Sequence, residues 1–382
     1  MRKLIALVAC SAILLVTPTF PASASTKAGT KCSKAGVTSV VSGKNYTCVK
    51  SGKKLVWDKG ILVPVVKPAT FVDNLSFDNL VENNSNISYT AWKKSSTIIS
   101  NSQSKAGSLN IYTGPKTKVF FEDISVPVNL VSRMFPSKTE LKEIIWIRYS
   151  FADIGWAEEK AKEKILPGEY FQLSHFQGGS LADGNCDSVA QNCNGAYEQT
   201  SASGIVVVME GVENSIPSDV TSGPRLKTGM LQAHEYFHSL QILPIQNKGI
   251  NVWPHAWWRE GGAEWVQNAA VNFNNYENYK KYLKDDCAYS CSGLSEGDIS
   301  EFLAQANDNY LPPKFDSWLN YSLGSHVIEI LTSISGPDVI VDMYAQMGKG
   351  QSFNEAFKGF YGLAWNEAIP LISKSIYKDL HS

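Results

Sequence analysis

The chain has 382 residues, of which 43% are hydrophobic and 19% are charged, and its formal net charge is −1. This composition is typical of a globular protein and excludes a disordered one. The length suffices for one large domain and a small one. Because the net charge is close to zero, no overall field favours nucleic acid or an anionic membrane as a partner. We therefore expect function to reside in a local site.

The first 25 residues have the features of a secretory signal peptide. Arg2 and Lys3 supply a positive start, residues 4–16 form a short apolar run, and residues 22–24 read Ala-Ser-Ala, a small-residue cleavage site. A lipoprotein processing box ending at Cys10 is the weaker alternative, because apolar sequence continues beyond it. No later segment reaches about 18 uninterrupted apolar residues. The sequence predicts an extracellular bacterial protein without a membrane span after signal removal.

Six cysteines remain after this segment, and they fall into three pairs that are close in sequence. An even number of cysteines in an exported chain indicates disulfides. The simplest pairing predicts the bonds Cys32–Cys48, Cys186–Cys193 and Cys287–Cys291.

Residues 26–60 are predicted to form a small module rich in Lys, Gly and Ser, with a short strand over residues 44–48. The module is too small for an apolar core of its own, so we expect a disulfide to stabilise it. It resembles the small Cys-pair modules near the start of exported actinobacterial proteins. Two roles are open for this module: association with the cell wall, or an inert spacer. Residues 61–87, with two prolines and an Asn/Ser-rich stretch, indicate a linker.

The main domain, residues 88–382, begins with strands and continues with helices. β-branched and aromatic runs predict strands, and Ala/Glu/Lys-rich or periodic segments predict helices. Residues 166–203, rich in Gly and Asn, are predicted to form a long excursion held by one cysteine pair. The chain becomes helical from about residue 225, and this order indicates an α+β architecture. The predicted strands are 109–112, 119–121, 144–151 and 205–209, and the first predicted helices are 89–100 and 152–165.

Residues 231–240 contain the pattern H-E-x-x-H at His234, Glu235 and His238. On a helix, positions i and i+4 share one face, so the two imidazoles converge on one metal ion. The intervening glutamate then lies near the coordination position that water fills at a catalytic zinc. The alternative is a surface helix that carries two unrelated histidines.

Catalytic zinc needs a third protein ligand. The metzincin continuation H-x-x-G-x-x-H is absent, but the segment WWREGGAEW carries Glu260, 22 residues after His238. Here the chain resembles the gluzincins, most closely the peptidase MA-like group, in which W-x-x-E-G-x-A-E follows H-E-x-x-H on a second helix. The resemblance implies that Glu260 is the third ligand and that Glu264 braces a ligand histidine. His255 is the alternative third ligand.

The glycines of this segment indicate tight packing. Gly261 and Gly262 each cost about 1 kcal/mol relative to alanine inside a helix, and close approach to the zinc helix would account for them. The surrounding tryptophans either line an aromatic cleft or belong to the core; they are Trp253, Trp257, Trp258 and Trp265.

Residues 320–331 look like the Y-x-x-G segment of peptidase MA-like enzymes, in which a tyrosine hydroxyl supports an oxyanion. The resemblance makes Tyr321 the candidate donor, with His326 as the alternative donor and simple ring packing as the alternative role. Further on, Gly336-Pro337 ends one helix and Ser352 with Glu355 forms a capping box for another. The resemblance covers about residues 225–378.

The sequence thus predicts a zincin-like α+β fold with an N-terminal mixed-sheet lobe, a mainly helical C-terminal lobe and a small disulfide-stapled module. The expected activity is hydrolysis of peptide bonds in a peptide or protein substrate, with one Zn²⁺ held by His234, His238 and Glu260. Glu235 is the expected general base and Tyr321 the expected oxyanion donor. A catalytically inactive binding protein on the same scaffold and a wall-associated protein are the alternatives.

Overall fold

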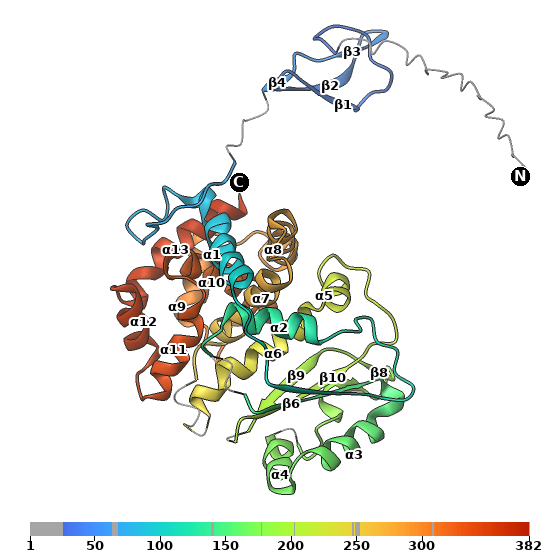
Figure 1. The fold of residues 1–382 in the computed structure, drawn as a ribbon. Coiled ribbons are helices and arrows are strands. Elements are labelled where there is room, and N and C mark those ends of the chain that lie inside the picture. The colour runs from blue at the N-terminus through green and yellow to red at the C-terminus, as the bar shows by residue number, and fades with distance from the viewer. Residues whose placement is uncertain are drawn as a thin grey trace, which may run out of the picture. The chain divides into compact units, whose positions relative to one another are not determined.

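The computed structural model describes residues 26–62, 68–138, 141–176, 178–201, 203–246, 248, 253–307 and 309–381. The predicted signal peptide lies outside the described residues. The chain divides between Pro68 and Ala69 into two compact units (Figure 1).

The small unit is an antiparallel meander stapled by one disulfide. Strand β2 (Lys44–Ser51) pairs with β1 (Thr38–Val41) on one side and with β3 (Lys54–Trp57) and β4 (Ile61–Leu62) on the other. Cys32 and Cys48 are joined and are the buried hydrophobic residues of this unit. With so little apolar burial, the disulfide supplies the constraint that a core supplies in larger domains.

The larger unit contains a four-stranded mixed sheet in the order β5-β6-β10-β9. Its strands are β5 (Ser108–Thr113), β6 (Glu143–Tyr149), β9 (Ala196–Thr200) and β10 (Ile205–Gly211). The inner strands β6 and β10 are parallel, and β9 runs antiparallel to β10 at the edge. Successive side chains along each strand point to opposite faces of the sheet. One face packs with Ala157 and Ala161 in one core, and the other packs with Ala233 and Tyr236 in a second core.

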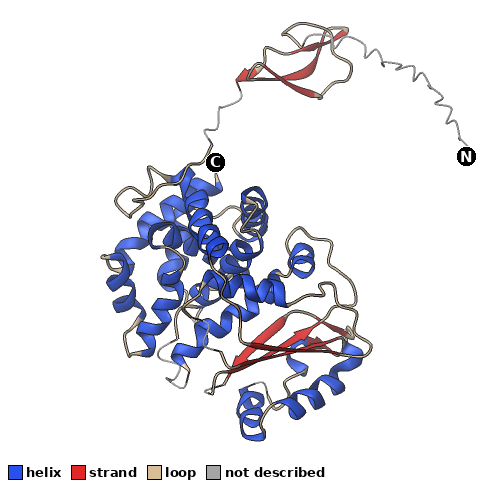
Figure 2. Ribbon diagram, in the orientation of Figure 1, coloured by secondary structure: helices blue, strands red, loops and turns tan. Residues whose placement is uncertain are grey.

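Helices cover both faces of this sheet and continue into a helical region (Figures 1 and 2). The helices before and within the sheet region are α1 (Ile87–Asn101), α2 (Ser125–Met134), α3 (Ile154–Lys164) and α4 (Pro167–Phe176). Those after the sheet are α5 (Ser222–Thr228), α6 (Met230–Ile242), α7 (Ala256–Val271), α8 (Tyr276–Ser290), α9 (Glu296–Gln305), α10 (Ser322–Ser335), α11 (Asp338–Gly348), α12 (Phe353–Tyr361) and α13 (Trp365–Leu380). In the described part of the chain, no helix combines the length and the apolar character that a bilayer crossing requires.

Two helices of this region, α6 and α7, are buried on nearly every side. All residues from Met230 to Gln241 in α6 are buried, although they include two histidines, two glutamines, a glutamate and a serine. A buried network attaches α6 to the sheet: Gln232 Nε2 donates to Glu210 Oε1 at 3.0 Å, and Glu210 also pairs with Arg148 and accepts from the indole of Trp146. Buried polar groups of this kind require partners, so the network fixes the position of α6 over the sheet.

The predicted α+β class and all three disulfides are confirmed. The capping box of Ser352 and Glu355 also forms, at the start of α12. Residues 119–121, predicted as a strand, have no strand pairing. Here the Arg148 side chain donates to the carbonyl of Phe121, at the end of the segment, and to that of Glu122, which follows it.

Two further predictions need correction. The predicted linker 61–87 is not a linker throughout: β4 belongs to the small unit, and the core of the larger unit includes Leu75, Phe77 and Leu80. Residues 63–67 lie outside the described residues. The predicted excursion 166–203 contains helix α4 and the edge strand β9. Both segments lack strong periodicity, so their structure depends on packing against the sheet and the helices.

Candidate metal centre

Helix α6 carries His234, Glu235 and His238 on its buried length. The two histidines lie one turn apart, and their ring centroids are 4.7 Å from each other. Ala233 and Phe237 pack in the core. The polar strip of α6 is therefore surrounded by apolar side chains and is open toward a cleft.

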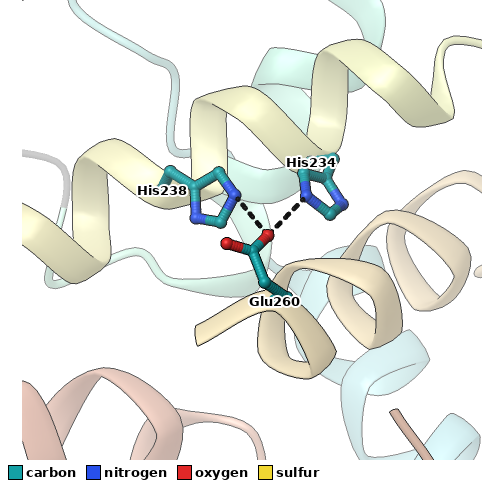
Figure 3. A group of neighbouring side chains, drawn as sticks. All are labelled: His234, His238 and Glu260. Atoms are coloured by element: carbon teal, nitrogen blue, oxygen red, sulfur yellow. Dashed lines mark ion pairs between the residues drawn. The ribbon is translucent and has the colours of Figure 1, made fainter. Parts of the chain in front are cut away.

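Glu260 on α7 completes the group (Figure 3). Its Oε2 atom lies 3.6 Å from His234 Nε2 and 3.4 Å from His238 Nε2. One ligand atom from each of these three residues lies within 4.8 Å of the other two. Two imidazole nitrogens and one carboxylate oxygen are donors that a transition-metal ion takes in proteins. The three side chains therefore fit the binding of one metal ion.

The two oxygens of Glu260 have different partners. Oε2 faces the histidines, whereas Oε1 accepts from Arg259 Nε at 3.0 Å. Burial opposes ionisation of this carboxyl, but the charge of His238, the hydrogen bonds from both histidines and Arg259 outweigh it, so the pKa of Glu260 is held well below its usual range. The carboxylate is thus oriented and charged, as a metal ligand must be.

Each histidine has a second partner on its other ring nitrogen. His238 Nδ1 lies 2.7 Å from Gln241 Oε1, and the Gln241 amide donates to the Arg259 carbonyl at 3.0 Å. His234 Nδ1 lies 3.5 Å from Glu264 Oε2. The hydrogen bond with Gln241 fixes the tautomer and the orientation of His238 and leaves its Nε2 for a metal. His234 Nδ1 and Glu264 Oε2 are at ion-pair distance and do not hydrogen-bond to each other.

Glu264 is itself held by a buried set of donors. The Tyr282 hydroxyl donates to its Oε1 at 2.8 Å, the Gln267 amide donates to the same oxygen, and Arg225 Nη1 lies 3.7 Å from Oε2. Burial raises the pKa of the Glu264 carboxyl, but Arg225, His234 and Tyr282 together lower it below its usual value. The role expected for Glu264 is compatible with this position beside His234.

The two glycines that follow Glu260 make room for two different neighbours. A β-carbon at Gly261 would lie 2.5 Å from the Cα of Gly324 on α10, so the two helices touch through their backbones at this point. A β-carbon at Gly262 would lie 2.9 Å from Gln241 Nε2 on α6. The sequence predicted close approach to the zinc helix for both glycines. That holds for Gly262, whereas Gly261 accommodates α10.

A cleft of about 680 Å³ opens over the metal group. Its lining includes Glu235 and Tyr321 beside the histidines. The Tyr321 ring lies parallel to the His234 ring at 5.9 Å and stacks on Trp318 at 4.5 Å. A volume of this size accommodates a short peptide segment or a small molecule.

The alternative ligands and donors lie elsewhere. The His255 ring packs against Trp257 at 5.5 Å and Phe353 at 4.7 Å. His326 is buried on α10, 3.9 Å from Asp379, and lines a separate small cavity. Neither histidine is part of the metal group. Three of the four tryptophans are core residues, and Trp253 lines the cleft.

Sequence reasoning missed three residues of the site. Gln241, three residues after His238 on the same helix face, was recognisable from its spacing. Arg225 lies before the motif, and no local pattern marks it. Glu198 on the edge strand β9 lines the cleft, and its Oε2 is buried without a hydrogen-bond partner among the described residues. Burial, reinforced by the charge of Glu235 and opposed by a hydrogen bond from Thr200, raises the pKa of Glu198 to about 8.

Comparison of the chain with protein-family models, with curated proteins and with solved structures gave no match. The geometry of the site therefore carries the functional argument.

Proposed function

We propose that this protein is a zinc-dependent metallopeptidase of the gluzincin type, with a zincin-like arrangement of sheet and helices. One observation carries the proposal. His234, His238 and Glu260 converge in a cleft that Glu235 also lines. A structural zinc site is closed by four protein ligands, whereas a catalytic site combines three protein ligands with an open position and an acid–base residue.

His234, His238 and Glu260 would hold the ion, and a bound zinc supplies Lewis acidity that polarises a peptide carbonyl and lowers the pKa of water. Glu235 accepts a proton from the attacking water and passes it to the leaving amine. Tyr321 donates its hydroxyl to the oxyanion that forms on the attacked carbonyl. Burial raises the pKa of Tyr321, and the charges of Glu260 and Glu235 add to this effect, so its hydroxyl keeps the proton that it must donate.

The decisive experiment compares Glu235→Gln with the parent protein on a mixed peptide library. We expect the parent to contain about one zinc per chain and to lose cleavage in a chelator. Glu235→Gln should retain the metal and lose activity about 10²–10⁴-fold, because only proton transfer is removed. Glu277→Gln, an exposed glutamate on α8, is the matched control and should behave like the parent.

Three results would contradict the proposal: absence of bound metal in the parent, cleavage by Glu235→Gln at the parental rate, or a parent that binds zinc and cleaves no peptide. The last result would favour a binding protein in which the metal has only a structural role.

A further inference from the structure

The small unit differs sharply in charge from the rest of the chain. Residues 26–62 contain eight lysines, no arginine and a single acidic residue, Asp58, so this segment carries a formal charge of +7. The whole chain carries −1 and residues 1–25 carry +2, so residues 63–382 carry −10. The near-neutral total therefore conceals a strongly basic unit attached to an acidic one.

The lysines of this unit are available to a partner. Seven of the eight are exposed, and none of the eight forms an ion pair within residues 26–62, all of which are described. The only acidic residue has a structural role, because Asp58 Oδ1 accepts from the backbone N–H groups of Thr47 and Gly60 at 3.0 and 2.9 Å. The positive charge is therefore not compensated inside the unit.

Strand register places a cluster of three lysines away from most of the exposed apolar residues. Lys50, Lys53 and Lys54 lie at the hairpin that joins β2 to β3. Most of the exposed aliphatic side chains near β2 lie at its opposite end, on Val40, Val41, Ile61 and Leu62, whereas Val49 is exposed beside Lys50. The two ends of β2 are about 20 Å apart, given about 3.3 Å per residue. A flat lipid surface needs apolar and basic groups on one face. At the apolar end, Lys44 pairs with Val41 and Leu62, but the cluster of three lysines lies at the other end, which favours a polymeric anion over a membrane.

The remaining lysines are distributed along the unit, including Lys44 at the start of β2. Lys31 borders β3 through its bridge to Val56, and Lys27 and Lys34 lie on the segment that precedes β1. Lysine is a flexible point charge, without the planar fork with which arginine recognises one carboxylate or phosphate bidentately. Dispersed point charges suit a flexible polymer with regularly repeated negative charges.

We propose that residues 26–62 bind an extended polyanion with a phosphodiester or phosphoanhydride backbone, and that this contact holds the metal-site unit close to the polymer. Electrostatic complementarity supplies the affinity. The contact is strongly salt-dependent because binding releases condensed counterions. It is independent of the proposed peptidase activity, since no residue of the metal centre takes part.

Binding of the chain without residues 1–25 to long-chain inorganic polyphosphate, measured between 50 and 200 mM salt, tests this inference. We expect binding that weakens steeply with salt. The variant Lys50→Gln/Lys53→Gln/Lys54→Gln should lower the slope of log K against log salt by about 2, at about 0.7 per lost contact. The control Lys349→Gln/Lys358→Gln/Lys374→Gln removes the same charge from exposed positions of the larger unit and should leave the slope unchanged.

Absence of polyphosphate binding at 50 mM salt would overturn the inference, as would equal weakening by the control variant. Tighter binding to anionic lipid vesicles or to duplex DNA, at equal phosphate concentration, would also overturn it in favour of those partners. Retention on isolated bacterial cell walls, lost after hydrolytic removal of their phosphodiester polymers, would identify the wall as the source. Circular dichroism and an unchanged unfolding midpoint establish that the lysine variants remain folded.

Discussion

Gly261 is the position at which a single methyl group should disturb the metal centre most directly. It follows Glu260, the proposed ligand, and a β-carbon there would lie 2.5 Å from the Cα of Gly324. Ordinary carbon contacts are about 3.5–4.0 Å, so Gly261→Ala requires α7 and α10 to separate by about 1 Å. Both helices contribute backbone atoms to this contact, so no side-chain rotation can relieve it.

The expected effect follows from two opposing contributions. Alanine gains about 1 kcal/mol over glycine in a helix, whereas overpacking of a tight contact costs about 1–3 kcal/mol and occasionally more. We expect Gly261→Ala to destabilise the larger unit by up to about 2 kcal/mol. Gly359→Ala in α12 is the matched control. Nothing lies within 4 Å of its β-carbon position, so it should stabilise by about 0.5–1 kcal/mol.

The displacement should also affect the metal site. Since Glu260 Oε2 lies 3.4–3.6 Å from both histidines, a shift of α7 by about 1 Å disrupts their convergence. Urea unfolding measures stability, and competition with a chromophoric chelator measures zinc affinity, which we expect to fall at least about 10-fold. If Gly261→Ala were as stabilising as Gly359→Ala and bound zinc like the parent, the backbone contact between α7 and α10 would not be what requires glycine.

Two further predictions concern buried carboxyls. Glu264→Gln should lower zinc affinity about 10–100-fold, because His234 loses its charged partner; unchanged affinity in the chelator assay would exclude this role. Burial raises the pKa of Glu329 to about 8, partly offset by the hydrogen bond from Tyr279 and reinforced by the charge of Asp379. The folded state then retains a proton that the unfolded state loses above pH ~4.5, so this group reduces stability progressively from pH ~4.5 to ~8, by an upper bound of about 5 kcal/mol. The melting temperature of Glu329→Gln should therefore decline less with pH over this range than that of the parent. The same decline in both proteins would contradict this assignment.

Local patterns in the sequence determine much of the candidate metal site. The spacing of His234 and His238 places both imidazoles on one face of any helix they occupy, because side chains four residues apart lie one above the other. The disulfide pairing follows from short separations, such as the sequence separation of four between Cys287 and Cys291. Short-range geometry of this kind depends only on backbone periodicity.

Only the tertiary structure decided which residues from distant segments of the chain lie against the histidine pair and its helix. That Glu260 and not His255 faces the histidines depends on the packing of α7 against α6, and Gly261 contacts α10 because three helices meet there. Glu198 reaches the cleft only because β9 pairs at the edge of the sheet, with the residue facing α6. Contacts between segments distant in sequence leave no periodic trace, because burial and charge at one position depend on what the whole chain packs against it.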